Sequence, residues 1–136
     1  MNDKTYIDTN ILIYLYSESE KQKQKTACEI VDSHICVTST QALNEASNVW
    51  SKRFGWDGPK IKLHLDNIEL ICNDIVLVQR NTIDMALNLV DLYKYSYYDC
   101  LMLASALESN CTIIYTEDMQ DRQLINGKLK IVNPFK

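Results

Sequence analysis

The sequence has few of the residues that break or crosslink a chain. Its 136 residues include three glycines and two prolines, which excludes collagen-like and Gly/Pro-rich disordered proteins. The five cysteines are odd in number and form no CxxC pair, so we expect buried, reduced thiols and a cytoplasmic protein. No apolar run approaches the ~18 residues that span a bilayer, and no signal-peptide pattern opens the chain, so we expect no membrane contact.

Positive charge is also in short supply. The chain has 14 Lys and Arg against 18 Asp and Glu, which gives a formal net charge of −4 and a pI near 5.1. Phosphate contacts need Lys and Arg, so this balance argues against an avid, sequence-independent nucleic-acid binder unless some carboxylates hold cations. One bound Mg²⁺ would bring the formal charge from −4 to −2, and two would bring it to zero.

Apolar residues, by contrast, make up 46% of the chain, which is enough for a packed core in a single domain over residues 1–136. Short apolar runs predict strands at 5–7, 35–38, 75–78, 112–115 and 129–132. Helical spacing predicts helices near 11–16, 21–33, 41–54, 61–68, 82–93 and 97–109, the fifth of them capped by Asn81. Apolar strands that alternate with helices indicate an α/β fold, with a parallel sheet covered on both faces.

Four acidic residues lie beside these apolar runs. Asp8 follows the first strand and Asp118 follows the fourth, while Glu45 and Asp99 lie on the helices 41–54 and 97–109. Taken singly, each has an ordinary explanation as a turn or cap residue, a polar loop residue, a solvated helical Glu or a partner of the helix dipole. Because sites in parallel sheets lie at the carboxyl ends of the strands, we expect the four side chains to converge.

Converging carboxylates define the chemistry that we expect. They repel one another unless a cation binds or some of them are protonated. No His or Cys lies at these positions to favour zinc, and oxygen ligands suit Mg²⁺ or Mn²⁺. A divalent ion held by carboxylates, with water in its open positions, is equipped for phosphodiester hydrolysis.

Basic and aromatic residues gather around the Gly- and Pro-containing segment 55–59, which we expect to separate two helices. The members of this group are Trp50, Lys52, Arg53, Trp56, Lys60 and Lys62. Either the basic residues are solvated surface, or together with the aromatic rings they supply charge and stacking for single-stranded RNA. We assign Trp50 and Phe54 to the core or to a dimer contact.

Five short segments match, in order and spacing, the motifs of one family. They are 6–12 (YIDTNIL), 41–45 (QALNE), 96–99 (SYYD) with 103–106 (LASA), 116–120 (TEDMQ) and 131–135 (IVNPF). Each is weak alone, but together they run from end to end of the chain. On these motifs the chain resembles a PIN domain, in particular the small VapC-type ribonuclease toxins of bacterial toxin–antitoxin pairs.

The resemblance implies a three-layer α/β/α sandwich with a five-stranded parallel sheet, and an endoribonuclease that uses Mg²⁺ or Mn²⁺. By motif matching, the catalytic and metal-holding residues are Asp8, Glu45, Asp99 and Asp118, with Thr9, Asn10 and Thr116 as supporting neighbours. The family often forms homodimers. A small antitoxin would lay a segment over the site and offer an Arg to the carboxylates, so RNA and an antitoxin are the expected partners.

The segment after Asp118 departs from the family pattern. Relatives tend to carry a His and a Gly there, whereas this chain has Asp121 and Arg122. Three roles are open for Asp121: it joins the metal site, replaces Asp118, or caps a helix. Arg122 either contacts RNA phosphate or neutralises the acidic residues.

Two other functions stay open. Metal-dependent phosphatases of the haloacid dehalogenase type also begin with an Asp after a buried strand, but they need a second Asp two residues later, where this chain has Asn10. A PIN-like domain without catalysis would serve as a protein-binding module, although nothing in the sequence favours that loss. The sequence has no helix-turn-helix signature or basic face for a DNA-binding role.

Overall fold

The computed structural model describes residues 3–136 as an α/β protein. The strands are β1 (Lys4–Ile7), β2 (Ile35–Ser39), β3 (Asp74–Val76), β4 (Ile113–Tyr115), β5 (Leu124–Ile125) and β6 (Leu129–Val132). The helices are α1 (Thr9–Leu15), α2 (Lys21–Ser33), α3 (Thr40–Lys52), α4 (Gly58–Ile71), α5 (Arg80–Tyr93) and α6 (Tyr97–Glu108). Every predicted strand and helix is present.

The strands form one sheet in the order β3-β2-β1-β4-β6-β5. All except β5 run parallel to their neighbours, as predicted. The expected number of five strands is too small by one, because β5 pairs antiparallel with β6. Asn126 and Gly127 form the turn between these two strands, both with positive φ. A strand of two residues is too short to show the alternation that identifies strands in a sequence.

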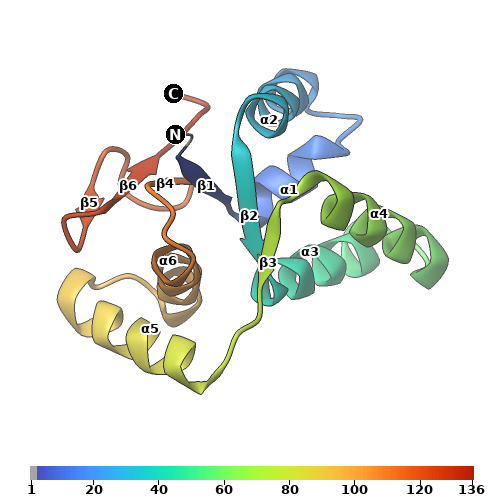
Figure 1. Ribbon diagram of the computed structural model, residues 1–136. Coiled ribbons are helices and arrows are strands. Elements are labelled where there is room, and N and C mark those ends of the chain that lie inside the picture. The colour runs from blue at the N-terminus through green and yellow to red at the C-terminus, as the bar shows by residue number, and fades with distance from the viewer. Residues whose placement is uncertain (1–2) are drawn as a thin grey trace.

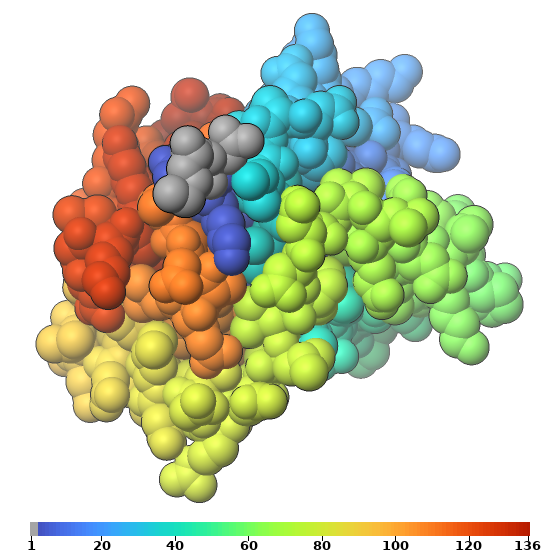
Figure 2. Space-filling view, viewed as in Figure 1, coloured from blue at the N-terminus to red at the C-terminus, as the bar shows by residue number. Residues whose placement is uncertain are grey.

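Helices cover both faces of the sheet and complete the predicted three-layer sandwich (Figure 1). The pair α5 and α6 lies on one side, and the pair α1 and α2 lies on the other. Residues 100–106 of α6 are all buried, because this helix packs on the sheet and is covered in turn by α5. In the space-filling view, α4 projects from the body of the molecule (Figure 2).

The strand order changes direction between β1 and β4. The chain adds β2 and β3 on one side of β1, then returns to place β4 and β6 on the other side. Such a switch point opens a crevice at the carboxyl ends of the two central strands. Ile7 pairs with Tyr115 there, so Asp8 and Thr116 follow neighbouring strand ends.

Side-chain caps fix where the helices begin. The caps of α1, α3 and α6 are Asp8, Ser39 and Ser96, whose side-chain oxygens accept backbone N–H groups of the first turn. The predicted Asn81 cap is wrong. Helix α5 begins at Arg80, because Gln79 and Thr82 form a reciprocal capping box.

The interior agrees with most of the sequence-based expectations. Trp50 is fully buried, as assigned, whereas Phe54 is 47% exposed and does not belong to the core. All five cysteines are free, and every one except the half-buried Cys28 is buried. Over residues 3–136 no helix is both long and apolar enough to cross a membrane.

Candidate active site

Asp8 lies at the carboxyl end of β1 and is almost fully buried, with 3% of the residue exposed. Its Oδ1 accepts the backbone N–H of Thr9 at 2.7 Å. Its Oδ2 accepts the hydroxyl of Thr116, also at 2.7 Å. Donors from the start of α1 and the end of β4 therefore hold both carboxylate oxygens in one orientation.

The turn after β4 is bonded to α1 at a second point. The buried Thr116 hydroxyl, which donates to Asp8, also accepts the N–H of Asp118 at 3.2 Å. Asn10 Nδ2 donates to Asp118 Oδ2 at 3.0 Å. Asp118 itself is exposed. Two of the three predicted supporting residues, Asn10 and Thr116, thus contact Asp118 and Asp8.

Glu45 reaches the same edge from α3. Its Oε1 accepts the Thr9 hydroxyl at 3.1 Å, and its Oε2 accepts Nε2 of Gln41 at 3.0 Å. Gln41 lies one turn earlier on the same helix, so it holds the carboxylate from within α3. Glu45 is half-buried, and Thr9 links it directly to Asp8.

Asp99 lies in the first turn of α6 and is half-buried. Its backbone N–H donates to the capping Ser96 hydroxyl oxygen at 3.2 Å. The N-terminus of a helix favours a negative charge at this position. Burial nevertheless raises the pKa of Asp99, although the Ser96 hydroxyl opposes the rise.

The four carboxylates share one electrostatic environment. Burial raises the pKa of Asp8 from 3.8 to about 7, even though the hydrogen bonds from Thr116 and Thr9 lower it. The negative charges of Asp118 and Glu45 raise it further. The same two charges raise the pKa of Asp99, so they lie within electrostatic range of both Asp8 and Asp99.

Within residues 3–136, no basic side chain forms an ion pair with these four acids. The ion pairs in this part of the chain are Lys23–Glu117, Arg80–Asp84 and Arg122–Asp121. Asn10 Oδ1 is buried beside Asp118 without a hydrogen-bond partner. In the same residues, no three His, Cys, Asp or Glu side chains lie close enough to share one metal ion as they stand. The acids are neighbours, but the predicted meeting of all four at a single point is not observed.

The other predicted residues lie at the margins. Asp121 Oδ1 accepts the N–H of Asn133 at 2.8 Å, so it fastens the C-terminal segment. Arg122 is exposed, and its Nε lies 3.8 Å from Asp121 Oδ2. The basic residues Lys52, Arg53 and Lys60 are exposed where α3 meets α4.

Sequence reasoning missed a polar network next to Asp118. Glu117 accepts hydrogen bonds from the Tyr14 hydroxyl and from Lys23 Nζ, the latter at 3.1 Å. The Lys23 ammonium also lies 4.7 Å from the ring centroid of Tyr14 and 5.3 Å from that of Phe135. Glu117 stood inside a recognised motif, but no spacing in the sequence connects it with a lysine 94 positions away.

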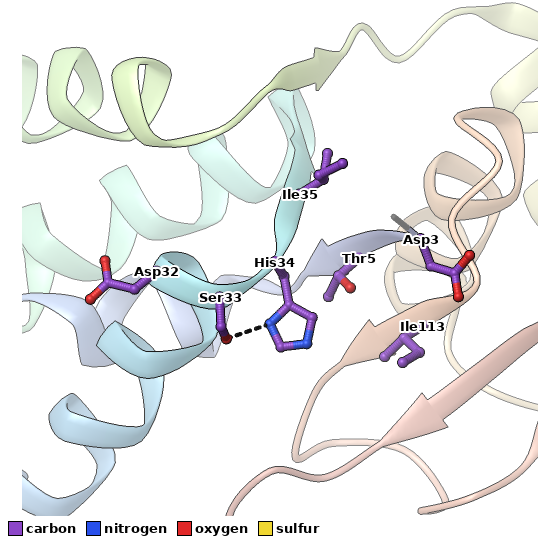
Figure 3. Close-up of a pocket in the computed structure, with 7 residues that line it drawn as sticks. All are labelled: Asp3, Thr5, Asp32, Ser33, His34, Ile35 and Ile113. Atoms are coloured by element: carbon purple, nitrogen blue, oxygen red, sulfur yellow. Dashed lines mark hydrogen bonds between the residues drawn. The ribbon is translucent and has the colours of Figure 1, made fainter. Parts of the chain in front are cut away.

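A hollow lies at the opposite, amino edge of the sheet, where the parallel strands begin (Figure 3). Its volume is about 510 Å³, and it is lined by Asp3, Thr5, Asp32, Ser33, His34, Ile35 and Ile113. His34 Nδ1 lies 3.0 Å from the Ser33 hydroxyl oxygen. The exposed Asp3 and Asp32 lie on opposite sides of the hollow (Figure 3). The described residues bring no group of acids together there, so we take the carboxyl edge as the candidate active site.

The fold and this edge define an α/β/α sandwich protein with acidic residues at the topological switch point. The sequence model of the PIN domain matches residues 5–123, and the chain belongs to the PIN domain family. No curated protein matches the chain significantly.

Solved structures of toxin–antitoxin proteins have the same fold. A toxin–antitoxin complex from Klebsiella pneumoniae matches with a TM-score of 0.71 and 20% identity, over 97% of this chain and 98% of that one. VapC20 from Mycobacterium tuberculosis, described as a sarcin–ricin-loop-cleaving toxin, matches with a TM-score of 0.67 and 17% identity, over 84% and 91%. VapBC2 from Rickettsia felis, bound to a promoter DNA fragment, matches with a TM-score of 0.67 and 15% identity, over 96% and 99%. At these identities the likeness establishes the fold.

Proposed function

We propose that this chain is a divalent-metal-dependent endoribonuclease that hydrolyses RNA phosphodiester bonds, and that it is the toxin of a type II toxin–antitoxin pair. The observation that carries the proposal is the setting of Asp8. This carboxylate is buried at the switch point, held by Thr9 and Thr116, and surrounded by further acids without a basic partner in residues 3–136. Membership of the PIN family supports the choice of reaction.

A divalent cation would relieve the electrostatic strain of this arrangement. A buried carboxylate without a counter-charge is costly, and its raised pKa reflects that cost. The nearby donors are carboxylate oxygens and the unpartnered Oδ1 of Asn10, which suit Mg²⁺ or Mn²⁺. Asp118 is exposed, so rotation of its side chain can bring it toward Asp8. The proposed ligands are Asp8, Glu45, Asp99 and Asp118.

The protein's own residues divide the remaining work. When bound, such an ion supplies an acidified water and positive charge opposite the phosphate. Thr9 and Thr116 hold both oxygens of Asp8 in place, and Asn10 orients the Asp118 carboxylate through its hydrogen bond to Oδ2. Asp99 lies in the first turn of α6, from where it would hold the ion on the helix side of the site.

The proposed partners follow from similar proteins. Structures with the same fold include toxin–antitoxin complexes, and we propose a small antitoxin for this chain as well. An antitoxin Arg laid on the acidic edge would supply the positive charge that the four acids lack. We also propose that the chain forms a homodimer in a cytoplasmic setting, as the family resemblance implies.

The alternatives are less well supported. A haloacid-dehalogenase-type phosphatase needs a second Asp at position 10, where the Asn10 amide instead donates to Asp118. A silent binding module gives no reason to bury Asp8 among other acids, since that arrangement costs stability.

Cleavage assays test the proposal. We expect the chain to cut RNA internally with Mg²⁺ or Mn²⁺, to stop in EDTA, and to leave a phosphate monoester intact. Asp99→Asn should lower cleavage by more than about a hundredfold. The matched control Asp91→Asn, which alters an exposed acid on α5, should cut normally. Full cleavage in EDTA, or by Asp99→Asn, would contradict the proposal.

A further inference from the structure

A rigid aromatic and basic surface lies where α3 meets α4, and we propose that it binds single-stranded RNA on its way to the acidic edge. We call this surface the stacking corner, and it consists of Arg53, Phe54, Trp56 and Lys60. The inference rests on the ribonuclease function proposed above and names the place where the substrate docks.

The backbone of the stacking corner is fixed on both sides of Gly55. The Arg53 N–H donates to the Val49 carbonyl at 2.8 Å, and the Trp56 N–H donates to the Trp50 carbonyl at 3.0 Å. Gly55 has a φ of 66°, in the left-handed region that suits glycine. The backbone conformation of the corner is therefore fixed before a ligand binds, so binding does not have to order a flexible loop.

The two rings of the corner have different roles. Trp56 stacks on the fully buried Trp50, with 5.1 Å between ring centroids and 12° between ring planes. Lys60 Nζ lies 4.4 Å from the Trp56 centroid. The Trp56 ring is therefore fixed by Trp50 beneath it and positions the ammonium group of Lys60. Phe54 lies beside it, 6.2 Å between centroids, and is 47% exposed. An exposed ring with a rigid backing is a surface on which a nucleobase can stack.

Two adjoining hollows connect the stacking corner with the acidic edge. One, of about 290 Å³, has Phe54 and Lys60 in its lining. The other, of about 340 Å³, is lined by Phe54 again, by Arg53 and by Asn10. Because Asn10 donates to Asp118, the second hollow ends beside the candidate active site. A strand whose base rests on Phe54 can therefore continue toward the acids.

The charges favour a polyanion on the α3–α4 side of this path. Arg53 and Lys60 are exposed and form no ion pair within residues 3–136. Glu117 in the lining is neutralised by Lys23 at 3.1 Å. Two further carboxylates line these hollows, Glu18 in the first and Glu20 in the second, so we expect the phosphates to lie beside Arg53 and Lys60. Free cations beside an exposed ring suit a single strand, since the bases of a duplex are already stacked on one another.

Binding measured without cleavage tests the inference. A short fluorescein-labelled single-stranded RNA of mixed sequence is titrated with the full chain in EDTA and followed by anisotropy. Phe54→Ala should weaken binding about tenfold, and Phe54→Trp should restore it. Arg53→Ala and Lys60→Ala should each make the salt dependence shallower by about 0.7 in log–log slope. The control Leu63→Ala, which removes a 66% exposed side chain from α4, should bind normally.

Tryptophan emission gives a second readout. The chain has two tryptophans, and Trp50 is fully buried. RNA should quench Trp56, and Trp56→Phe should lose that response while thermal melts confirm its fold.

The outcomes separate this inference from the proposed function. If the wild-type chain cleaves RNA but Phe54→Ala binds and cleaves as well as Leu63→Ala does, the stacking corner is overturned and the ribonuclease stands. Equal binding of duplex and single-stranded RNA would also overturn it. If Phe54→Ala loses a protein partner but keeps its RNA affinity, the corner is a protein-docking surface instead. If the wild-type chain neither binds nor cleaves any RNA, both proposals fail.

Discussion

The amino and carboxyl edges of the sheet are both polar, but they are built differently. At the amino edge, His34 Nδ1 contacts the neighbouring Ser33 (Figure 3) and a carbonyl one turn earlier. A longer-range contact of 3.4 Å joins His34 Nε2 to the Tyr115 hydroxyl. At the carboxyl edge, Asp8 and Asp118 each bond to a side chain 108 positions away. The amino edge has the larger hollow. Long-range bonds that meet at carboxylates, and not the size of a hollow, therefore distinguish the candidate active site.

The two edges also differ in how their acids are solvated. Asp3 and Asp32 at the amino edge are exposed, so water hydrates their charges. Asp8 at the carboxyl edge is buried, and its pKa rises to about 7. Only the carboxyl edge has an uncompensated electrostatic cost that a bound cation would remove.

Among the substitutions that compare the two edges, the largest effect should come from the hydroxyl that joins two acids at the carboxyl edge. Thr116→Val keeps the shape of the side chain but removes the donor to Asp8 and the acceptor for the Asp118 N–H. We expect a loss of about 10- to 100-fold in RNA cleavage, the usual cost when a group that orients metal ligands is removed. Thr116→Ser should restore most of the activity. Normal cleavage by Thr116→Val would show that Asp8 does not need this hydrogen bond.

The next effect concerns stability without metal. Because the pKa of Asp8 is raised from 3.8 to about 7 on folding, the folded protein binds the proton more tightly than the unfolded chain. The free energy of unfolding should therefore fall as pH rises through this interval, by up to about 1.4 kcal/mol per unit. Asp8→Asn removes this loss and keeps an acceptor for the Thr9 N–H. In EDTA, thermal melts should find Asp8→Asn more stable than the wild type at about pH 8, and the difference should shrink at about pH 5.

Added metal should reverse that order. Millimolar Mn²⁺ should raise the melting temperature of the wild type by mass action, while Asp8→Asn should respond weakly because it lacks one ligand charge. Identical melting temperatures with EDTA and Mn²⁺ in the wild type would argue strongly against a metal site at this edge.

Much of the fold could be predicted because its strands are mostly apolar and its helices mostly amphipathic. The strand 129–132 was predicted with the bounds that β6 has in the structure. The missed strand, β5, has two residues and pairs only through β6, so its formation depends on a tertiary contact. The start of α5 was missed for a similar reason, since Gln79 and Thr82 compete with Asn81 for the cap.

The site could be predicted only in outline. Asp8 and Asp118 were found because parallel strands bring their carboxyl ends together, which is a property of topology. The sequence does not reveal that one hydroxyl, on Thr116, serves both acids. Nor does it reveal that Lys23 joins Glu117, because side-chain partners across elements depend on rotamers and exact packing.

A smaller effect is expected from that missed network. Lys23→Met and Glu117→Gln each break the ion pair beside Asp118. This ion pair is partly exposed, because the side chains of Lys23 and Glu117 are 33% and 24% accessible. Such pairs contribute about 0.2–1 kcal/mol to the free energy of unfolding, so each substitution should destabilise the protein by no more than that. The kcat for RNA cleavage should fall only slightly, with KM little changed. The double variant should be no worse than either single one, since both remove the same contact. Additive losses would show that the two residues act separately.

The smallest effect should come from the hydroxyl of the amino edge that corresponds to Thr116. Thr5 is 1% exposed and its Oγ1 has no hydrogen-bond partner within residues 3–136. A buried hydroxyl without a partner costs about 1–3 kcal/mol, so Thr5→Val should be at least as stable as the wild type and should cleave RNA normally. Thermal melts and the cleavage assay, run beside Thr116→Val, check both expectations. A loss of cleavage in Thr5→Val comparable to that in Thr116→Val would mean that both edges contribute equally, because each substitution replaces one buried hydroxyl by a methyl group, at opposite ends of the same sheet.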